Sequence, residues 1–530
     1  MSEPTKKQSF LQGTVWLAFA AAVVKVIGAL YKIPLNAIIG EQGFGYFNTA
    51  YEIYTVLMSL AVAGLPVAMS RMISQANALG HYNQMRRTYH TARMIFLSMG
   101  IAGSLLMTLL SKQLAAFQKQ PDAWAAIACL GPCILLICIM STYRGFFQGQ
   151  SNMRPTAISQ MMEAFCKLIV GIIAALALLK LTNSVAYAAA GAILGVTASC
   201  LLSAVYLFFQ HRKARKSLPV SSDPVCSYGE TAKQLLSIAI PIAIGSAGLS
   251  LLTMLETRVY LGRLEDLGYL KLQRDTMKGI YDMAKTIYLL PIAFITPISV
   301  SIIPAITSHL TLKDHSGTRS TSESAIRIAA LISAPCAVGL GILSEPVTGL
   351  LGGYTGENLA LASMLMRLLS ISLILHAIIL ITNAIMQAMG HANLPVVNML
   401  IGGVLKLTAV YILSGNPNIG ILGAPIGAAI GYIVILGLNI VTLRRCSTQP
   451  PAVLRQASRS LLAALCMGVG VYAAWYGLHL VTSSRLVLCA GPICVGVIIY
   501  AVAIIKCKAL TREDCLLLPK GEKIADLLHL

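Results

Sequence analysis

Apolar segments long enough to cross a membrane alternate with short polar loops along almost the whole chain. About 20 apolar residues in a helix span the hydrocarbon core, whereas an isolated strand there would leave its backbone groups without partners. The pattern therefore predicts an all-α, polytopic membrane protein with about fourteen transmembrane helices. Their expected limits are 13–38, 46–72, 91–111, 124–147, 155–180, 185–209, 234–260, 279–305, 324–350, 358–388, 394–414, 420–443, 459–480 and 486–506.

The composition supports a membrane location. Of 530 residues, 56% are hydrophobic and 11% are charged, and the mean hydropathy is +0.75. Soluble proteins carry about 25% charged residues. The formal net charge of +20 would suggest a nucleic-acid partner for a soluble protein, but Lys and Arg in cytoplasmic loops explain most of it in a membrane protein. We expect no nucleic-acid partner.

Loop charge predicts the orientation of the chain. With the N-terminus in the cytoplasm, 25 of the 40 Lys and Arg residues fall in inside loops, nine in outside loops and six within spans. This bias predicts a multi-pass protein of the plasma membrane with both termini cytoplasmic. The first apolar segment is too long for a cleaved signal peptide and contains Lys25 and Lys32, so we interpret it as the first membrane helix.

A basic, polar segment at 211–233 divides the apolar pattern. We predict an N-terminal six-helix lobe at 1–210, a cytoplasmic linker at 211–233, a C-terminal six-helix lobe at 234–443, and two additional helices with a cytoplasmic tail at 444–530. A weak internal repeat supports the two lobes, because Gln148 and Lys167 have the same separation as Gln387 and Lys406. Such parallel repeats are related by a pseudo-two-fold axis and usually hold substrate between them.

Charged residues inside the predicted spans are the main functional candidates, because charge is costly at the centre of a bilayer. Lys25 and Lys32 lie seven residues apart, two helical turns, and so share one face of the first helix. Lys285 lies in the eighth helix, three residues after Asp282. We expect the three lysines to line a cavity and bind substrate.

Three further residues are candidates for substrate binding. Glu52 lies in the second span near three tyrosines, Arg71 ends that span, and Arg258 ends the seventh. The two arginines could equally be anchors whose side chains extend to the membrane surface. Glu163 and Lys167 are four residues apart, a spacing that predicts a structural ion pair within the fifth helix.

The excess of cationic residues within the spans favours an anionic substrate, and phosphate or pyrophosphate fits best because Lys and Arg can bind it without a metal. The sequence contains no GxxxxGK[ST] loop for ATP, and its 13 cysteines have no metal-ligand spacing. We expect no catalytic residues, no metal and no cofactor. Transport would then depend on a coupling ion, the membrane potential or exchange of substrate.

Several segments carry a family resemblance: KVIGALYKIPL, IGEQGFGYF, GLPVAMSRMIS and YRGFFQGQSNMRPTAISQ. With them the chain resembles the MurJ, SpoVB and polysaccharide-exporter proteins of the multidrug/oligosaccharidyl-lipid/polysaccharide (MOP) superfamily, over essentially its whole length. The resemblance implies a flippase that moves lipid II or a polysaccharide precursor, linked to a polyprenyl pyrophosphate, from the inner to the outer leaflet.

The same resemblance implies two six-helix lobes around a cationic cavity, with a groove for the polyprenyl tail at about 459–506. Basic residues of the first and eighth helices would bind substrate. By motif position these are Lys25 and Lys285, with Lys32 a near match. Two alternatives stay open: a cation-coupled multidrug exporter of the same superfamily, and a non-transporting factor in envelope or spore assembly.

Overall fold

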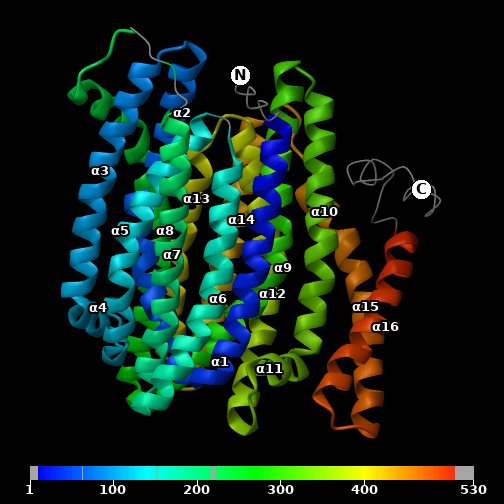
Figure 1. Ribbon diagram of the computed structural model, residues 1–530. Coiled ribbons are helices and arrows are strands. Elements are labelled where there is room, and N and C mark those ends of the chain that lie inside the picture. Colours follow the sequence, from blue (N-terminus) through cyan, green and yellow to red (C-terminus); the bar gives the residue numbers. More distant parts are fainter. Residues whose placement is uncertain (1–9, 63, 151, 217–218, 220–222, 508–530) are drawn as a thin grey trace. The chain divides into compact units, whose positions relative to one another are not determined.

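The computed structural model describes residues 10–62, 64–150, 152–216, 219 and 223–507, which are almost entirely helical (Figure 1). Thirteen of the described helical segments are long and apolar enough to cross a membrane, which confirms the predicted all-α, polytopic fold class. The described helices are α1 (Phe10–Val62), α2 (Leu65–Ala78), α3 (Tyr82–Leu109), α4 (Ser111–Phe117), η1 (Pro121–Ala123), α5 (Trp124–Gly149), α6 (Arg154–Thr182), α7 (Val185–Lys216), α8 (Tyr228–Asp266), α9 (Lys271–Thr311), α10 (His315–Ile342), α11 (Ser344–Gly352), α12 (Gly356–Ala388), α13 (Asn393–Ser414), η2 (Gly420–Leu422), α14 (Gly423–Cys446), α15 (Val453–Val481) and α16 (Arg485–Lys506).

The difference between thirteen and fourteen spans arises in α1. This element has 53 residues, about 80 Å of helix, which is far more than the hydrocarbon core of about 30 Å. It is two helices joined at Gly40, whose φ of 66° and ψ of −179° are not helical. Glycine suits this position because it has no Cβ and adopts a positive φ without strain. The predicted spans 13–38 and 46–72 lie on either side of this break.

The chain forms two compact units. Unit 1 comprises Met1–Leu261 and Lys271–Gly279, and unit 2 comprises Gly262–Leu270 and Ile280–Leu530. α9 therefore begins in unit 1 and continues in unit 2. The boundary between the two units, at 261–280, comes after the predicted linker at 211–233. The division into two six-helix lobes stays a prediction.

Small residues allow close helix packing in unit 1. A Cβ on Gly195 of α7 would overlap the backbone of Gly171 in α6, and one on Gly191 would overlap the carbonyl group of Ala174. Membrane helices associate through such contacts because lipid supplies no hydrophobic force between them. The α6–α7 pair is therefore a tightly packed part of the unit 1 core.

Unit 2 combines close packing with a buried amide network. Gly402 of α13 and Gly431 of α14 approach each other so closely that a Cβ on either would contact the other's carbonyl oxygen. Asn439 of α14 donates to Asn383 of α12 at 2.8 Å and accepts from Asn398 of α13 at 2.9 Å. α15 and α16, orange to red in Figure 1, lie side by side in this unit.

Candidate functional site

A row of charged and polar side chains marks the first turns of α9. Lys271 is three and four residues before Arg274 and Asp275, and Lys278 is four and three residues after them, which brings these side chains near one another on the helix surface. Gly279 ends the row, and a Cβ there would overlap the carbonyl oxygen of Glu41 in α1. The first turns of α9 thus lie in direct backbone contact with α1, within unit 1.

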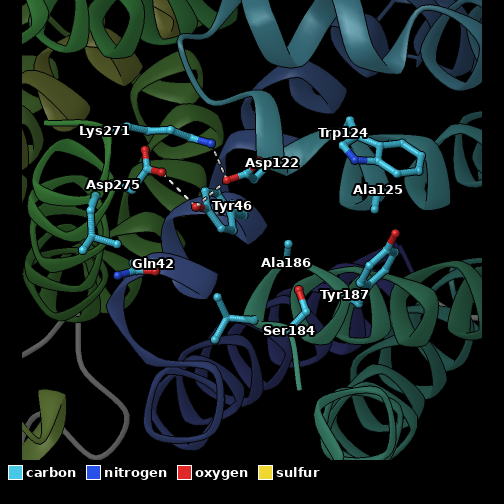
Figure 2. Close-up of a pocket in the computed structure, with 12 residues that line it drawn as sticks. Gln42, Tyr46, Asp122, Trp124, Ala125, Ser184, Ala186, Tyr187, Lys271 and Asp275 are labelled. Carbon is cyan, nitrogen blue, oxygen red and sulfur yellow. Dashed lines mark hydrogen bonds and ion pairs between the residues drawn. The ribbon is translucent and has the colours of Figure 1, made fainter. Parts of the chain in front are cut away.

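Asp275 is the centre of a buried hydrogen-bond group, with only 2% of its surface exposed. The Tyr46 hydroxyl donates to its Oδ2 at 2.8 Å, and Gln120 Nε2 donates to its Oδ1 at 3.1 Å. Tyr46 also approaches Asp122 at 3.4 Å, and Asp122 forms an ion pair with Lys271 (Figure 2). One tyrosine hydroxyl therefore connects two carboxylates, one on α9 and one on η1.

This group borders a cavity of about 580 Å³ in unit 1 (Figure 2). Trp124 of α5 and Tyr187 of α7 supply aromatic walls, while Gln42, Asp122 and Asp275 supply polar ones. The volume falls in the range of ordinary small-molecule sites. The lining contains two carboxylates and one lysine, so its net charge is opposite in sign to that of the expected site for an anion.

Glu52 belongs to a second buried group beside the first. Its Oε1 lies 3.4 Å from Lys278 Nζ, and the two side chains are 11% and 0% exposed. Gln118 Nε2 donates to Glu52 Oε2 and to the carbonyl oxygen of Met254, each at 3.3 Å. The fully buried Lys278 is tolerated here because its charge is paired with the Glu52 carboxylate, which in turn accepts a hydrogen bond from Gln118.

Two predicted site residues, Arg258 and Glu52, contact consecutive residues at the end of α4. The guanidinium of Arg258 lies over the ring of Phe117, 4.1 Å from its centroid, and donates to the carbonyl oxygen of that residue. Glu52 contacts the next residue, Gln118. Arg71, by contrast, is exposed near the middle of α2, seven residues before that helix ends.

The first-helix lysines belong to the earlier half of α1. Lys32 is half-buried, donates to Asn48 Oδ1 at 3.3 Å and lies 5.9 Å from the centroid of the Phe44 ring. Lys25 is on the helical backbone of α1, but its side chain lies outside the described residues. Lys32 therefore borders a group of aromatic side chains within unit 1.

Lys285 belongs to unit 2 and has a carboxylate partner there. Its Nζ lies 2.7 Å from Asp282 Oδ1, with the lysine side chain 27% exposed and Asp282 2% exposed. It also lies 4.6 Å from the centroid of the Tyr281 ring. The ammonium is thus partly neutralised, although more than a quarter of its side chain is accessible.

The expected ion pair between Glu163 and Lys167 is not formed. Arg144 of α5 binds Glu163 instead, with Nη2 3.1 Å from its Oε2. Arg144 Nε also donates to Ser159 of α6 at 3.1 Å, which fixes the guanidinium against that helix. The helical spacing rule considered α6 alone and did not include a competing arginine from a neighbouring helix.

Sequence reasoning missed Tyr46, Asp122, Lys271, Asp275 and Lys278. Lys271 and Lys278 lie before the predicted eighth span, which starts at 279, whereas α9 begins eight residues earlier and contains both. The helical spacing of charges in KLQRDTMK could have indicated that the helix starts earlier. Their partners could not have been found, because Glu52 is 226 residues from Lys278.

Solved structures define the class of protein to which this fold belongs. The chain superposes on the lipid II flippase MurJ in an inward closed conformation with a TM-score of 0.69, at 13% identity, over 92% of this chain and 98% of that one. It superposes on an inward-facing multidrug resistance MATE family transporter of the MOP superfamily with a TM-score of 0.68, at 16% identity, over 81% and 97%. The fold is that of the MOP superfamily transporters.

Sequence comparison gives the family. Residues 10–309 match the polysaccharide biosynthesis protein family, so the chain belongs to that family, and the resemblance seen in its motifs is confirmed. Stage V sporulation protein B of Bacillus subtilis (strain 168) is 27% identical over 83% of this chain and 84% of its own length. The lipid II flippase MurJ of the same organism is 24% identical over 87% of each chain.

Proposed function

We propose that this protein is a flippase that moves a polyprenyl-pyrophosphate-linked sugar precursor, lipid II or a polysaccharide precursor, from the inner to the outer leaflet of the plasma membrane. It would work by alternating access, with both termini in the cytoplasm. A coupling ion or the membrane potential would supply the energy. The substrate and the surrounding membrane lipid are the expected partners.

The observation that carries this proposal is similarity along the whole chain to a lipid II flippase. The MurJ structure covers 92% of this chain, whereas the MATE structure covers 81%. The last two helices, α15 and α16, follow the two predicted six-helix lobes. These two helices would form the proposed groove for the polyprenyl tail, which a multidrug exporter does not need.

Charge supports the same substrate class. We propose that Lys25, Lys32 and Lys285 contact the pyrophosphate, since an ammonium can bind phosphate oxygens directly. The ion pair of Lys285 with Asp282 would be exchanged for the more highly charged substrate. Substrate roles for Arg71, Arg258 and Glu52 stay predictions, and the contacts of Glu52 and Arg258 favour a structural role for both.

The test is a flipping assay with purified protein in liposomes. A fluorescent polyprenyl-pyrophosphate-linked sugar is placed in both leaflets, and the fraction accessible to an outside quencher or enzyme is followed with time. Lys32→Ala and Lys285→Ala should each slow flipping at least about tenfold, the loss expected for one charge-assisted hydrogen bond. Lys180→Ala, at the exposed end of α6, is the matched control.

Three outcomes separate the hypotheses. Wild-type liposomes that do not flip the lipid faster than empty ones would disprove the proposal. Efflux of cationic drugs that depends on Glu52 would favour the multidrug exporter. Full flipping by the triple variant Lys25→Ala, Lys32→Ala, Lys285→Ala would remove the proposed role of the lysines but keep the flippase, whereas absence of flipping by wild type would leave the non-transporting assembly factor as the alternative.

A further inference from the structure

Lys167 lies where a lysine cannot reach the membrane surface. It is close to the midpoint of the 29-residue helix α6, so each end of the helix is about 20 Å away. It shares a helix face with Ala164, Gly171 and Ala175, all buried, whereas Phe165 on another face is exposed. Its side chain therefore points into unit 1 rather than toward lipid.

Aromatic rings, not carboxylates, surround this ammonium. Lys167 Nζ lies 5.5 Å from the centroid of Tyr31 and 5.9 Å from that of Tyr51, both on α1. The nearest acid in sequence, Glu163, is bound by Arg144. Among the described residues, no carboxylate lies within ion-pair distance of Lys167. The two rings stabilise a cation but do not neutralise it.

The same rings connect Lys167 to Lys32. Tyr31, Phe44, Phe47 and Tyr51 form an aromatic cluster on α1, with successive ring centroids 4.9–6.2 Å apart. Lys32 lies over the Phe44 ring of this cluster, and Lys167 lies over the Tyr31 and Tyr51 rings. Two ammonium groups from two helices thus border one cluster within unit 1.

The sequence repeat gives independent support. Lys406 occupies the position in unit 2 that corresponds to Lys167. Its Nζ lies 6.0 Å from the centroid of the Tyr432 ring, so each repeat places a lysine beside a tyrosine ring. Ionisable residues inside membrane proteins normally face a partner or a cavity, and a lysine beside aromatic rings keeps its ammonium donors for an anion.

We propose that Lys167 is a further substrate-binding residue that contacts a phosphate oxygen of the lipid-linked substrate, beside the same aromatic cluster as Lys32. This inference rests on the proposed function. The cluster would hold the lysine side chain extended, so that its ammonium is preorganised for the oxyanion. Substitution of Lys167 should then reduce recognition of the pyrophosphate and leave recognition of the hydrocarbon tail unchanged.

The experiment measures binding of three lipid probes with the same chain length: polyprenyl pyrophosphate, polyprenyl monophosphate and uncharged polyprenol. Full-length wild type is compared with Lys167→Met, Lys167→Gln and Lys167→Arg in detergent or nanodiscs. Met and Gln should weaken pyrophosphate binding about 10- to 100-fold, the value of one charge-assisted hydrogen bond. Arg should retain most of the binding, polyprenol affinity should not change, and Lys180→Gln should match wild type.

The outcomes distinguish this inference from the proposed function. If wild type does not prefer pyrophosphate to polyprenol, the proposed function fails. If wild type has this preference and Lys167→Met keeps it, only the role of Lys167 is wrong. Equal weakening for all three lipids would show a structural role and also overturn the inference. Lys167→Met should fold, because an apolar side chain in this position has no charge to desolvate.

Discussion

The buried ion pair between Glu52 and Lys278 allows a quantitative test of how α9 is held against α1. The perturbation is Glu52→Gln, Lys278→Met and the double variant. At 3.4 Å and an effective dielectric constant near 20, the attraction between the two charges is about 5 kcal/mol. Desolvation of the two ions opposes it by several kcal/mol each. The net value of the pair is therefore small, but the cost of breaking it is not.

The two single variants should differ because the two side chains differ in burial. Glu52→Gln leaves the fully buried ammonium of Lys278 without this carboxylate and should cost about 3–5 kcal/mol. Lys278→Met leaves a carboxylate that is 11% exposed and still accepts from Gln118, so about 2 kcal/mol is expected. The double variant should be more stable than Glu52→Gln alone.

The assay is unfolding of the purified protein, with the coupling energy taken from the double-mutant cycle. Asp266→Asn is the control, because it breaks the ion pair with Arg263 in which Asp266 is 61% exposed, and about 0–1 kcal/mol is expected. Additive effects of the two substitutions, or a greater loss for Lys278→Met than for Glu52→Gln, would refute the reasoning.

Three further outcomes are expected. Gly279→Ala should lower the melting temperature and the yield of folded protein, because its Cβ would overlap the Glu41 carbonyl, whereas Gly229→Ala has open space and should be neutral. Asn439→Ala should cost about 2–4 kcal/mol in denaturant titration, because it leaves buried amides unsatisfied. The Gly317 N–H and His309 hold the pKa of Asp314, the N-cap of α10, below its usual range. Its contribution to stability should therefore be present above about pH 4 and lost at lower pH, so a melting-temperature difference between wild type and Asp314→Asn should shrink there.

Much of the fold could be predicted because the length of an apolar segment is a local property. The last five predicted spans, from 358–388 to 486–506, each overlap one long described α-helix, and 324–350 overlaps α10 and the short α11. Errors arose where a helix continued beyond its apolar part. α9 begins at Lys271 rather than 279, since its polar first turns pack against α1 and not against lipid.

The candidate site was less predictable, because the partners of a buried charge are not a local property of the sequence. The sequence identified Lys32, Glu52 and Lys285 as charges in membrane helices, and all three lie in described helices. It could not identify their partners. Glu163 illustrates this, because a local rule paired it with Lys167 while the structure pairs it with Arg144, 19 residues away on α5.

The sequence by itself determined that this chain crosses a membrane many times, that its spans carry an excess of cationic residues, and to which family it belongs. These properties depend on segment length, residue type and short motifs, which need no knowledge of neighbours. Only the tertiary structure decided which charges meet. Lys278 is neutralised by Glu52, whereas Lys167 faces tyrosine rings, because packing brings together side chains that are far apart in the sequence and each buried charge binds the partner that packing supplies.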